Sequence, residues 1–224
     1  MRSIVTVVVV MGMLLCFCGV SFAGEWSGLL VLKNDVNFPK GKDVSATQQV
    51  CAWVQYKWIG LGVDLVMSAD KKERYFQGSP YVTGKIDLKK WGELYPLVGF
   101  SGDDTGTDYV QTGFWYSKGF GKLHTFWDIR HYWAVKAQTT SYIDSFLEVK
   151  YPLTKNEKLF AGLDLEYIHY FEKDHDWYFV GPLVGYKFTK NIAFVVRASR
   201  EWDVSHDGGT KPTDKIRTMI VFTF

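Results

Sequence analysis

The stretch Leu159–Phe171, with the sequence LFAGLDLEYIHYF, decides the fold. Its odd-numbered positions hold apolar or aromatic side chains apart from His169, whereas its even-numbered positions include Gly162, Asp164 and Glu166. A period of two residues is typical of a β-strand, because successive side chains of a strand point to opposite faces. The stretch therefore predicts a strand with one apolar face and one charged face.

The same alternation recurs along the chain from residue 25 to the C-terminus. Val63 and Leu65, for example, alternate with Asp64. We expect strands at 25–34, 47–58, 60–68, 79–88, 93–102, 108–118, 121–135, 140–152, 158–171, 176–188, 191–202 and 215–224. A set of twelve amphipathic strands forms either a soluble sandwich or a membrane barrel, and the connections distinguish these two architectures.

The predicted connections differ in length at the two ends of the strands. Longer or more charged links follow the odd-numbered strands, at 35–46, 69–78, 103–107, 136–139, 172–175 and 203–214. Tight turns follow even-numbered strands, for example at 89–92, 118–121 and 189–191. Longer loops at one end, with short turns and both termini at the other, are typical of outer-membrane barrels. We therefore predict an all-β, closed antiparallel transmembrane barrel of about twelve strands, with ten or fourteen as alternatives.

Aromatic residues on the apolar faces fall near the strand ends. Those near the tight turns are Tyr56, Trp58, Tyr116, Tyr151, Tyr186, Phe188, Phe222 and Phe224, and those near the longer loops are Trp133, Phe171 and Tyr178. Two such belts are expected where rings lie at the two interfaces of a membrane. Because hydrocarbon offers no hydrogen bonds to the backbone, an all-strand chain can span a bilayer only as a closed barrel.

The first 23 residues are predicted to form a cleaved secretory signal peptide. Arg2 precedes an apolar run from Ile4 to Leu15, and Ser21–Ala23 carries a small-residue cleavage pattern. An uncleaved helical anchor is the alternative, because the apolar stretch is nearly long enough to span a bilayer. Cleavage would leave residues 24–224 as a single barrel domain in which Cys51 is the only cysteine, so no intrachain disulfide is expected.

The last predicted strand ends on an aromatic residue. Its apolar face holds Ile216, Thr218, Ile220, Phe222 and Phe224. This ending resembles the C-terminal signature of Gram-negative outer-membrane proteins. The resemblance implies recognition of Phe224 by the barrel-insertion machinery. It also implies a place in the bacterial outer membrane, in contact with its lipid and lipopolysaccharide.

The opposite faces of the strands would line the lumen with charges of both signs and with aromatic rings. The predicted pore-lining residues are Asp64, Trp115, Phe126, Asp128, Arg130, Asp144, Phe146, Glu148, Asp164, Glu166, Arg197 and Arg217. The acids come mainly from the third, seventh, eighth and ninth predicted strands, whereas Arg197 and Arg217 lie on the last two. Such a separation would create a transverse field that orients dipolar solutes. The alternative is a set of internal ion pairs that fill the lumen, because twelve strands lie between filled and open barrels.

Inward rings beside carboxylates suit a planar solute such as a nucleobase or a sugar ring. Gln111, Thr112, Trp115, Phe120, Phe126 and Asp128, followed by Leu159–Tyr167, resemble the middle of the nucleoside-specific outer-membrane channel family. The resemblance implies a twelve-stranded barrel and passive nucleoside uptake, but the N-terminal third of the chain lacks the family pattern. Oligosaccharide-specific porins are a second comparison, with lumens richer in arginine than this one. We predict a channel for passive diffusion of small polar solutes, with nucleoside-like and sugar-like solutes both open.

The sequence is also compatible with two other functions. One is a filled barrel with a structural or adhesive role. The other is an outer-membrane lipid acyl hydrolase, because pairing two strands around the turn near Lys155 puts His169 opposite Ser141 at the lipid-facing rim. A serine beside a histidine is the nucleophile and base of acyl hydrolases. The inferred strands place no orienting acid beside this pair, although Glu172 and Asp174 are close in sequence.

The remaining patterns exclude other classes of protein. The chain is 47% hydrophobic and 17% aromatic, which is too apolar for a disordered protein. A formal net charge of +2 offers no basic footprint for a nucleic-acid polymer. The sequence has no phosphate-binding loop, no Cys-x-x-Cys pair and no helical histidine motif, so we expect no cofactor and no metal site.

Overall fold

The computed structural model describes residues 25–40, 43–68, 76–103, 106–171, 175–205 and 209–224. The predicted signal peptide, residues 1–23, lies outside the described residues. The strands are β1 (Trp26–Pro39), β2 (Ser45–Tyr56), β3 (Ile59–Ser68), β4 (Phe76–Gly84), β5 (Ile86–Asp87), β6 (Glu93–Asp103), β7 (Gly106–Phe120), β8 (Leu123–Ala134), β9 (Tyr142–Pro152), β10 (Leu159–Tyr170), β11 (His175–Lys187), β12 (Ile192–Ser205) and β13 (Gly209–Thr223). A 3-10 turn, η1, covers Lys89–Trp91. Among the described residues, no helix has the length and apolar character needed to cross a membrane.

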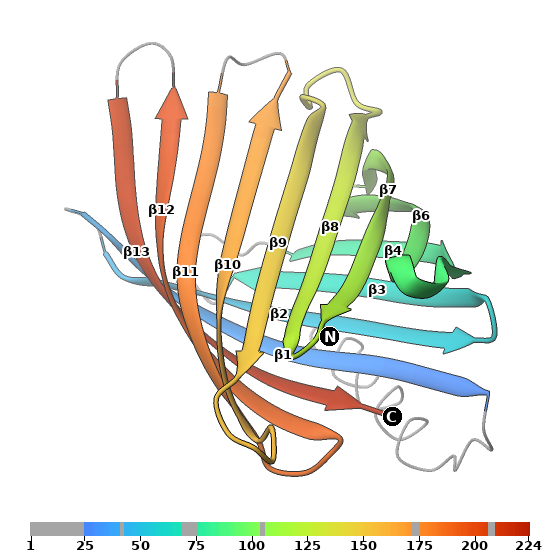
Figure 1. Ribbon diagram of the computed structural model, residues 1–224. Coiled ribbons are helices and arrows are strands. Elements are labelled where there is room, and N and C mark those ends of the chain that lie inside the picture. Colours follow the sequence, from blue (N-terminus) through green and yellow to red (C-terminus); the bar gives the residue numbers. More distant parts are fainter. Residues whose placement is uncertain (1–24, 41–42, 69–75, 104–105, 172–174, 206–208) are drawn as a thin grey trace, which may run out of the picture.

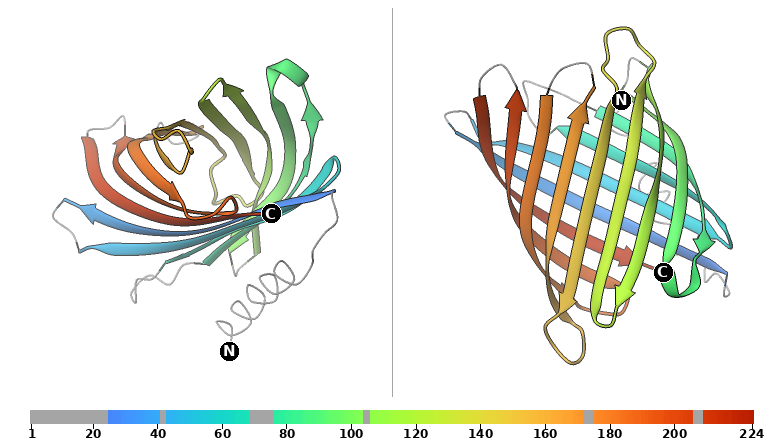
Figure 2. Two further views of the ribbon diagram at one scale, coloured as in Figure 1. Left: turned by 60° about the horizontal axis from the view of Figure 1, so that its bottom comes forward. Right: turned by 45° about the horizontal axis from the view of Figure 1, so that its top comes forward.

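The long strands form one closed antiparallel barrel, as the alternating pattern predicted (Figures 1 and 2). Each long strand pairs with the next long strand in the chain, so that β4 pairs with β6, and β1 pairs with β13. The two-residue strand β5 extends the edge of β6 without entering the ring. The ring therefore has twelve strands, which confirms the predicted number.

The two faces of the wall differ in exposure in the way the sequence alternation predicted. On β11, Gly181, Leu183 and Gly185 are buried, whereas Pro182 and Val184 between them are exposed. Large apolar side chains are exposed around the outside, among them Leu61, Val82, Val98, Leu163, Leu165, Val184, Phe194, Ile216 and Ile220. An apolar band of this kind on a closed barrel is the surface that contacts lipid.

The predicted aromatic belts lie at the two ends of the apolar band. Trp58, Tyr151 and Phe188 are exposed at the end that holds the tight turns, and Trp133 and Phe171 are exposed at the other end. Amphipathic rings at these two levels fit the two membrane interfaces. The belts therefore agree with a barrel that spans a bilayer.

The links between strands correct the predicted difference in loop length. At the supposed long-loop end, the gaps between strands are two to seven residues, and at the other end they are two to eight. The predicted loop 35–46 is wrong because β1 continues to Pro39 and β2 starts at Ser45, and the predicted loop 203–214 is largely strand. Polar residues mark where a hairpin leaves the hydrocarbon, while backbone pairing continues beyond that point. Polarity was therefore a poor guide to the ends of strands.

The β1–β13 seam closes the barrel with the last residue of the chain. The N–H of Gly28 donates to the carbonyl of Phe224 at 2.9 Å, and the N–H of Phe224 donates back at 3.2 Å. A Cβ on Gly28 would lie 2.1 Å from the nearest carbon of the Phe224 ring. Only glycine lets the Phe224 ring approach the wall this closely at this point.

Side chains complete the β4–β6 seam, where the backbone ladder is interrupted. The Nε2 amide of Gln111, on the neighbouring β7, donates to the carbonyl of Phe100 at 3.1 Å and to that of Pro80 at 3.4 Å. The hydroxyl of Ser79 donates to that of Ser101 at 2.9 Å. These bonds replace ladder bonds that Pro80 cannot donate, since proline has no N–H.

Candidate functional site

The strand register defines a row of inward residues from β7 to β12. Each residue of this row pairs across the ladder with the next: Trp115, Asp128, Phe146, Glu166, Phe179 and Glu201. Rings and carboxylates alternate along it, and we call it the ring–carboxylate row. Its members face the lumen because they share the faces of the buried residues Trp115 and Phe179.

Aromatic side chains form a continuous band on the inner wall. The ring centroids of Trp53 and Trp115 lie 5.8 Å apart, and those of Trp115 and Phe126 lie 6.2 Å apart. Phe126 is 6.5 Å from Phe146, which is 6.5 Å from Phe179. These separations are within the range of edge and offset ring contacts. The band therefore connects β2 with β11 through the interior.

Arg130 connects distant parts of the wall across the lumen. Its Nη1 donates to Oδ2 of Asp64 on β3 at 2.8 Å, and its Nε and Nη2 donate to Asp128 at 2.8–3.0 Å. Three strands, β4, β6 and β7, separate β3 from β8 along the wall. The contact therefore passes through the interior and not along the ladder.

Two rings enclose the Arg130 guanidinium. It lies 5.1 Å from the centroid of Tyr81 and 5.7 Å from that of Trp115. Trp53 extends the group by donating from Nε1 to the hydroxyl of Thr83 at 3.0 Å. We call the set Trp53, Asp64, Tyr81, Trp115, Asp128 and Arg130 the lumenal bridge. Its side chains lie in the interior of the barrel between β2 and β8.

The other two inward arginines also pair with carboxylates. Nη1 of Arg197 donates to Oδ2 of Asp164 at 2.9 Å, and the guanidinium lies 4.1 Å from the centroid of Phe179. Arg217 forms a two-point contact with Asp35, with both N–O distances at 2.5 Å. These pairs agree with the second prediction, that internal ion pairs occupy the lumen, because each of the three inward arginines is bonded to a carboxylate.

The structure places the twelve predicted pore-lining residues on the inward faces of their strands. Those that are buried are Trp115, Arg130, Asp164, Arg197 and Arg217. Those that are only half-buried are Asp64, Phe126, Asp128, Asp144, Phe146, Glu148 and Glu166. Their role in passing solutes stays a prediction. The half-buried group lies mainly on β8, β9 and β10, which makes this the more open part of the inner wall.

Sequence reasoning missed Asp35 and Tyr81 as site residues. Asp35 fell in a predicted loop, although the alternation of Val31 and Lys33 on β1 continues to it and would have placed it inward. Tyr81 carried no signal of its own, because its role depends on Arg130 from a distant strand. A Cβ on Gly62, its register partner, would lie 2.2 Å from the Tyr81 ring, so the glycine admits the ring.

Tyrosines occupy the inner wall near the other end of the same strands. Tyr142 lies 4.4 Å from Tyr132, 5.3 Å from Tyr109 and 5.3 Å from Tyr170, measured between ring centroids. They come from β7, β8, β9 and β10, above the ring–carboxylate row. Aromatic side chains therefore line the lumen from the loop end of the barrel to the middle of the barrel.

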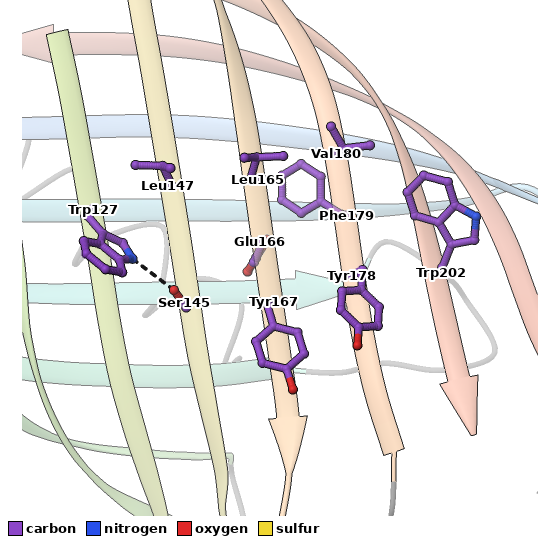
Figure 3. A pocket seen from close by; sticks show the side chains of 10 residues that line it. All are labelled: Trp127, Ser145, Leu147, Leu165, Glu166, Tyr167, Tyr178, Phe179, Val180 and Trp202. Carbon is purple, nitrogen blue, oxygen red and sulfur yellow. Dashed lines mark hydrogen bonds between the residues drawn. The ribbon is translucent and has the colours of Figure 1, made fainter. Parts of the chain in front are cut away.

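The outer wall has a groove of about 420 Å³ over β8 to β12 (Figure 3). Its outward side chains are Trp127, Ser145, Leu147, Leu165, Tyr167, Tyr178, Val180 and Trp202. Nε1 of Trp127 donates to the hydroxyl of Ser145 at 3.0 Å. Nδ1 of His169 lies 2.8 Å from Oδ1 of Asp176 beside this groove.

The predicted pairing of His169 with Ser141 is wrong. His169 pairs with Ile143, and the N–H of Phe171 donates to the carbonyl of Ser141 at 3.1 Å. The turn centres on Asn156 instead of Lys155, and a turn displaced by one residue shifts the register by two.

The hydroxyl of Ser141 has a structural partner, because it accepts from the N–H of Ala134 at 3.0 Å. Ser141 and His169 therefore do not form the predicted nucleophile–base pair.

The described part of the chain contains no group of three or more His, Cys, Asp or Glu side chains that could hold a metal ion.

An ion pair joins the β8–β9 link to β7. In this link, Lys136 pairs with Asp108 at 2.5 Å, and this bond raises the pKa of the lysine. The contact ties the link to β7.

Solved structures with a similar fold include two porins and an outer membrane channel. The KdgM porin has a TM-score of 0.62 at 10% identity, covering 87% of this chain and 99% of the porin. The NanC porin has a TM-score of 0.65 at 10% identity, covering 85% and 98%. The COG4313 outer membrane channel from Pseudomonas putida F1 has a TM-score of 0.60 at 11% identity, covering 92% and 97%.

No protein-family model and no curated protein matches the sequence. At these identities the structural likeness shows the fold alone. Together with the apolar outer band and the aromatic belts, this fold places the protein in a bacterial outer membrane, as the sequence predicted.

Proposed function

We propose that the barrel is a channel for passive diffusion of small polar solutes that have a flat apolar face. The observation that carries this proposal is the ring–carboxylate row. A sugar or a nucleoside has hydroxyl donors at its edge and a face that can stack on a ring. Alternating rings and carboxylates offer partners to both parts of such a solute along one path.

Two lines of support concern the class of solute. One KdgM porin structure is of a complex with disordered oligogalacturonate, so a related fold holds a sugar chain. The half-buried rings of Phe126 and Phe146 leave surface open to a solute in this lumen. A sugar-like solute is our first choice, and a nucleoside-like solute is the alternative within the same mechanism.

A filled barrel with a structural or adhesive role is the second candidate. The observation that favours it is an apolar cluster inside the wall, formed by Val31, Phe160, Leu183, Val195 and Met219. These side chains come from β1 and from β10 to β13, and they fill space on the inner faces of those strands. The two functions differ in one measurable property, because a filled barrel passes no ions.

Reconstitution of the purified protein in planar bilayers tests the channel. We expect stepwise single-channel currents, together with swelling of proteoliposomes in isotonic solutions of small sugars. A complete absence of steps and of swelling, with the protein folded, would support the filled barrel instead.

Replacement of Phe146 by alanine tests stacking on the row. We expect a half-blocking sugar concentration about two- to tenfold higher than in the unmodified channel, because one ring contact is worth about 0.5–1.5 kcal/mol. The matched control is Phe194→Ala, since Phe194 is a phenylalanine on the outer wall. Equal block in all three channels would show that the Phe146 ring does not contact the solute.

Proper assembly is a further part of the proposal. Phe224 pairs with Gly28 at the closing seam, and we propose that the insertion machinery recognises this terminal residue. The outer groove and the apolar band then face lipid and lipopolysaccharide.

A further inference from the structure

The inward arginines are shielded from the lumen. Arg130, Arg197 and Arg217 expose 9%, 1% and 9% of their surface, and each is bonded to at least one carboxylate. A buried and neutralised guanidinium offers a passing anion little attraction. The arginines therefore join strands of the wall through buried ion pairs.

Two carboxylates on the open side of the wall form no such direct bond to an arginine or lysine in the described part of the chain. Asp144 on β9 and Glu166 on β10 are half-buried and occupy diagonally adjacent inward positions of the β9–β10 ladder. Oδ1 of Asp144 has no hydrogen-bond partner, and no ion pair joins either residue to a cation among the described residues. Asp164, which is 1% exposed, also has a buried oxygen without a partner, Oδ1.

The remaining inward charges do not offset this pair. Lys150 pairs with Glu148 at 2.6 Å, and Lys215 pairs with Glu201. Away from the strand ends, the inward carboxylates are Asp35, Asp64, Asp128, Asp144, Glu148, Asp164, Glu166 and Glu201, and the inward cations are Lys33, Arg130, Lys150, Arg197, Lys215 and Arg217. Acids outnumber cations, and the uncompensated ones lie beside the rings of the ring–carboxylate row.

We propose that the lumen is selective for cations, and that Asp144 and Glu166 set this selectivity. The inference rests on the proposed channel function and narrows its solute class. Uncompensated carboxylates in a low-dielectric wall raise the local concentration of cations and repel anions. The channel favours a sugar or other polyol that is neutral or carries a protonated amine, over one that carries a carboxylate or a phosphate.

The reversal potential of the channel in a steep KCl gradient tests this proposal. For the unmodified protein we expect a potassium-to-chloride permeability ratio of about three or more. The isosteric double variant Asp144→Asn/Glu166→Gln should bring the ratio close to one, with single-channel steps retained. The control is Asp214→Asn, because Asp214 pairs with Arg200 and its side chain is 58% exposed on the outer wall.

The outcomes distinguish a failure of the cation selectivity from a failure of the channel function. Channels that conduct but prefer chloride, or a double variant with an unchanged ratio, would overturn the selectivity and leave the channel function in place. The absence of conducting steps in the unmodified protein would overturn the channel function itself, and the inference would fall with it. Flux of glucosamine faster than that of glucuronate into proteoliposomes is the expected companion result.

Discussion

Replacement of Arg130 by alanine is expected to raise the single-channel conductance about twofold, because conductance depends on the narrowest part of a pore. The Arg130 side chain joins β8 to Asp64 on β3 and lies between the rings of Tyr81 and Trp115. Its removal breaks the lumenal bridge and opens the space between these walls. Planar-bilayer recordings at fixed salt measure the change directly.

Arg130→Met separates the size of the side chain from its charge. Methionine loses the same bonds to Asp64 and Asp128 but keeps much of the volume, so its conductance should stay near that of the unmodified channel. Heat-dependent migration on a denaturing gel shows whether each variant is folded. A folded alanine variant with unchanged conductance would show that the lumenal bridge is not the narrowest part.

The closed barrel was predictable because each strand carries its own evidence. In Leu159–Phe171 alone, the alternation tells which side chains face inward, and one residue of error would exchange the two faces. The inward positions of Asp164 and Glu166 follow from this pattern. Lipid outside and a polar interior impose the same alternation on all twelve strands, so the evidence accumulates along the chain.

Contacts between strands were less predictable, because they depend on register and closure. A turn displaced by one residue, from Lys155 to Asn156, was enough to separate Ser141 from His169. The contact of Arg130 with Asp64 requires the barrel to close and the strands to tilt. The local residue pattern of a single strand encodes neither property. The sequence therefore revealed which charges face inward, but not which arginines are neutralised.

The Arg217→Met variant should lose about 3–5 kcal/mol in free energy of unfolding, because it leaves a buried carboxylate without its main partner. Asp35 is 1% exposed, and both of its oxygens accept from Arg217 across the β1–β13 seam. Lys215 lies 3.8 Å from Asp35, which is too far to replace the two direct bonds. Urea titration of the barrel in lipid vesicles, followed by tryptophan fluorescence, measures the loss.

The second substitution Asp35→Asn in the same chain should restore most of this stability, since it removes the buried charge that the methionine leaves behind. Arg200→Met is the matched control, because Arg200 and Asp214 expose 56% and 58% of their side chains at a different point of the wall. An exposed pair contributes about 1 kcal/mol or less, so this control should unfold close to the unmodified protein. Equal losses for Arg217→Met and Arg200→Met would contradict the role of the buried pair in closing the barrel. A double variant no more stable than Arg217→Met would show that the lost stability came from packing and not from the uncompensated charge.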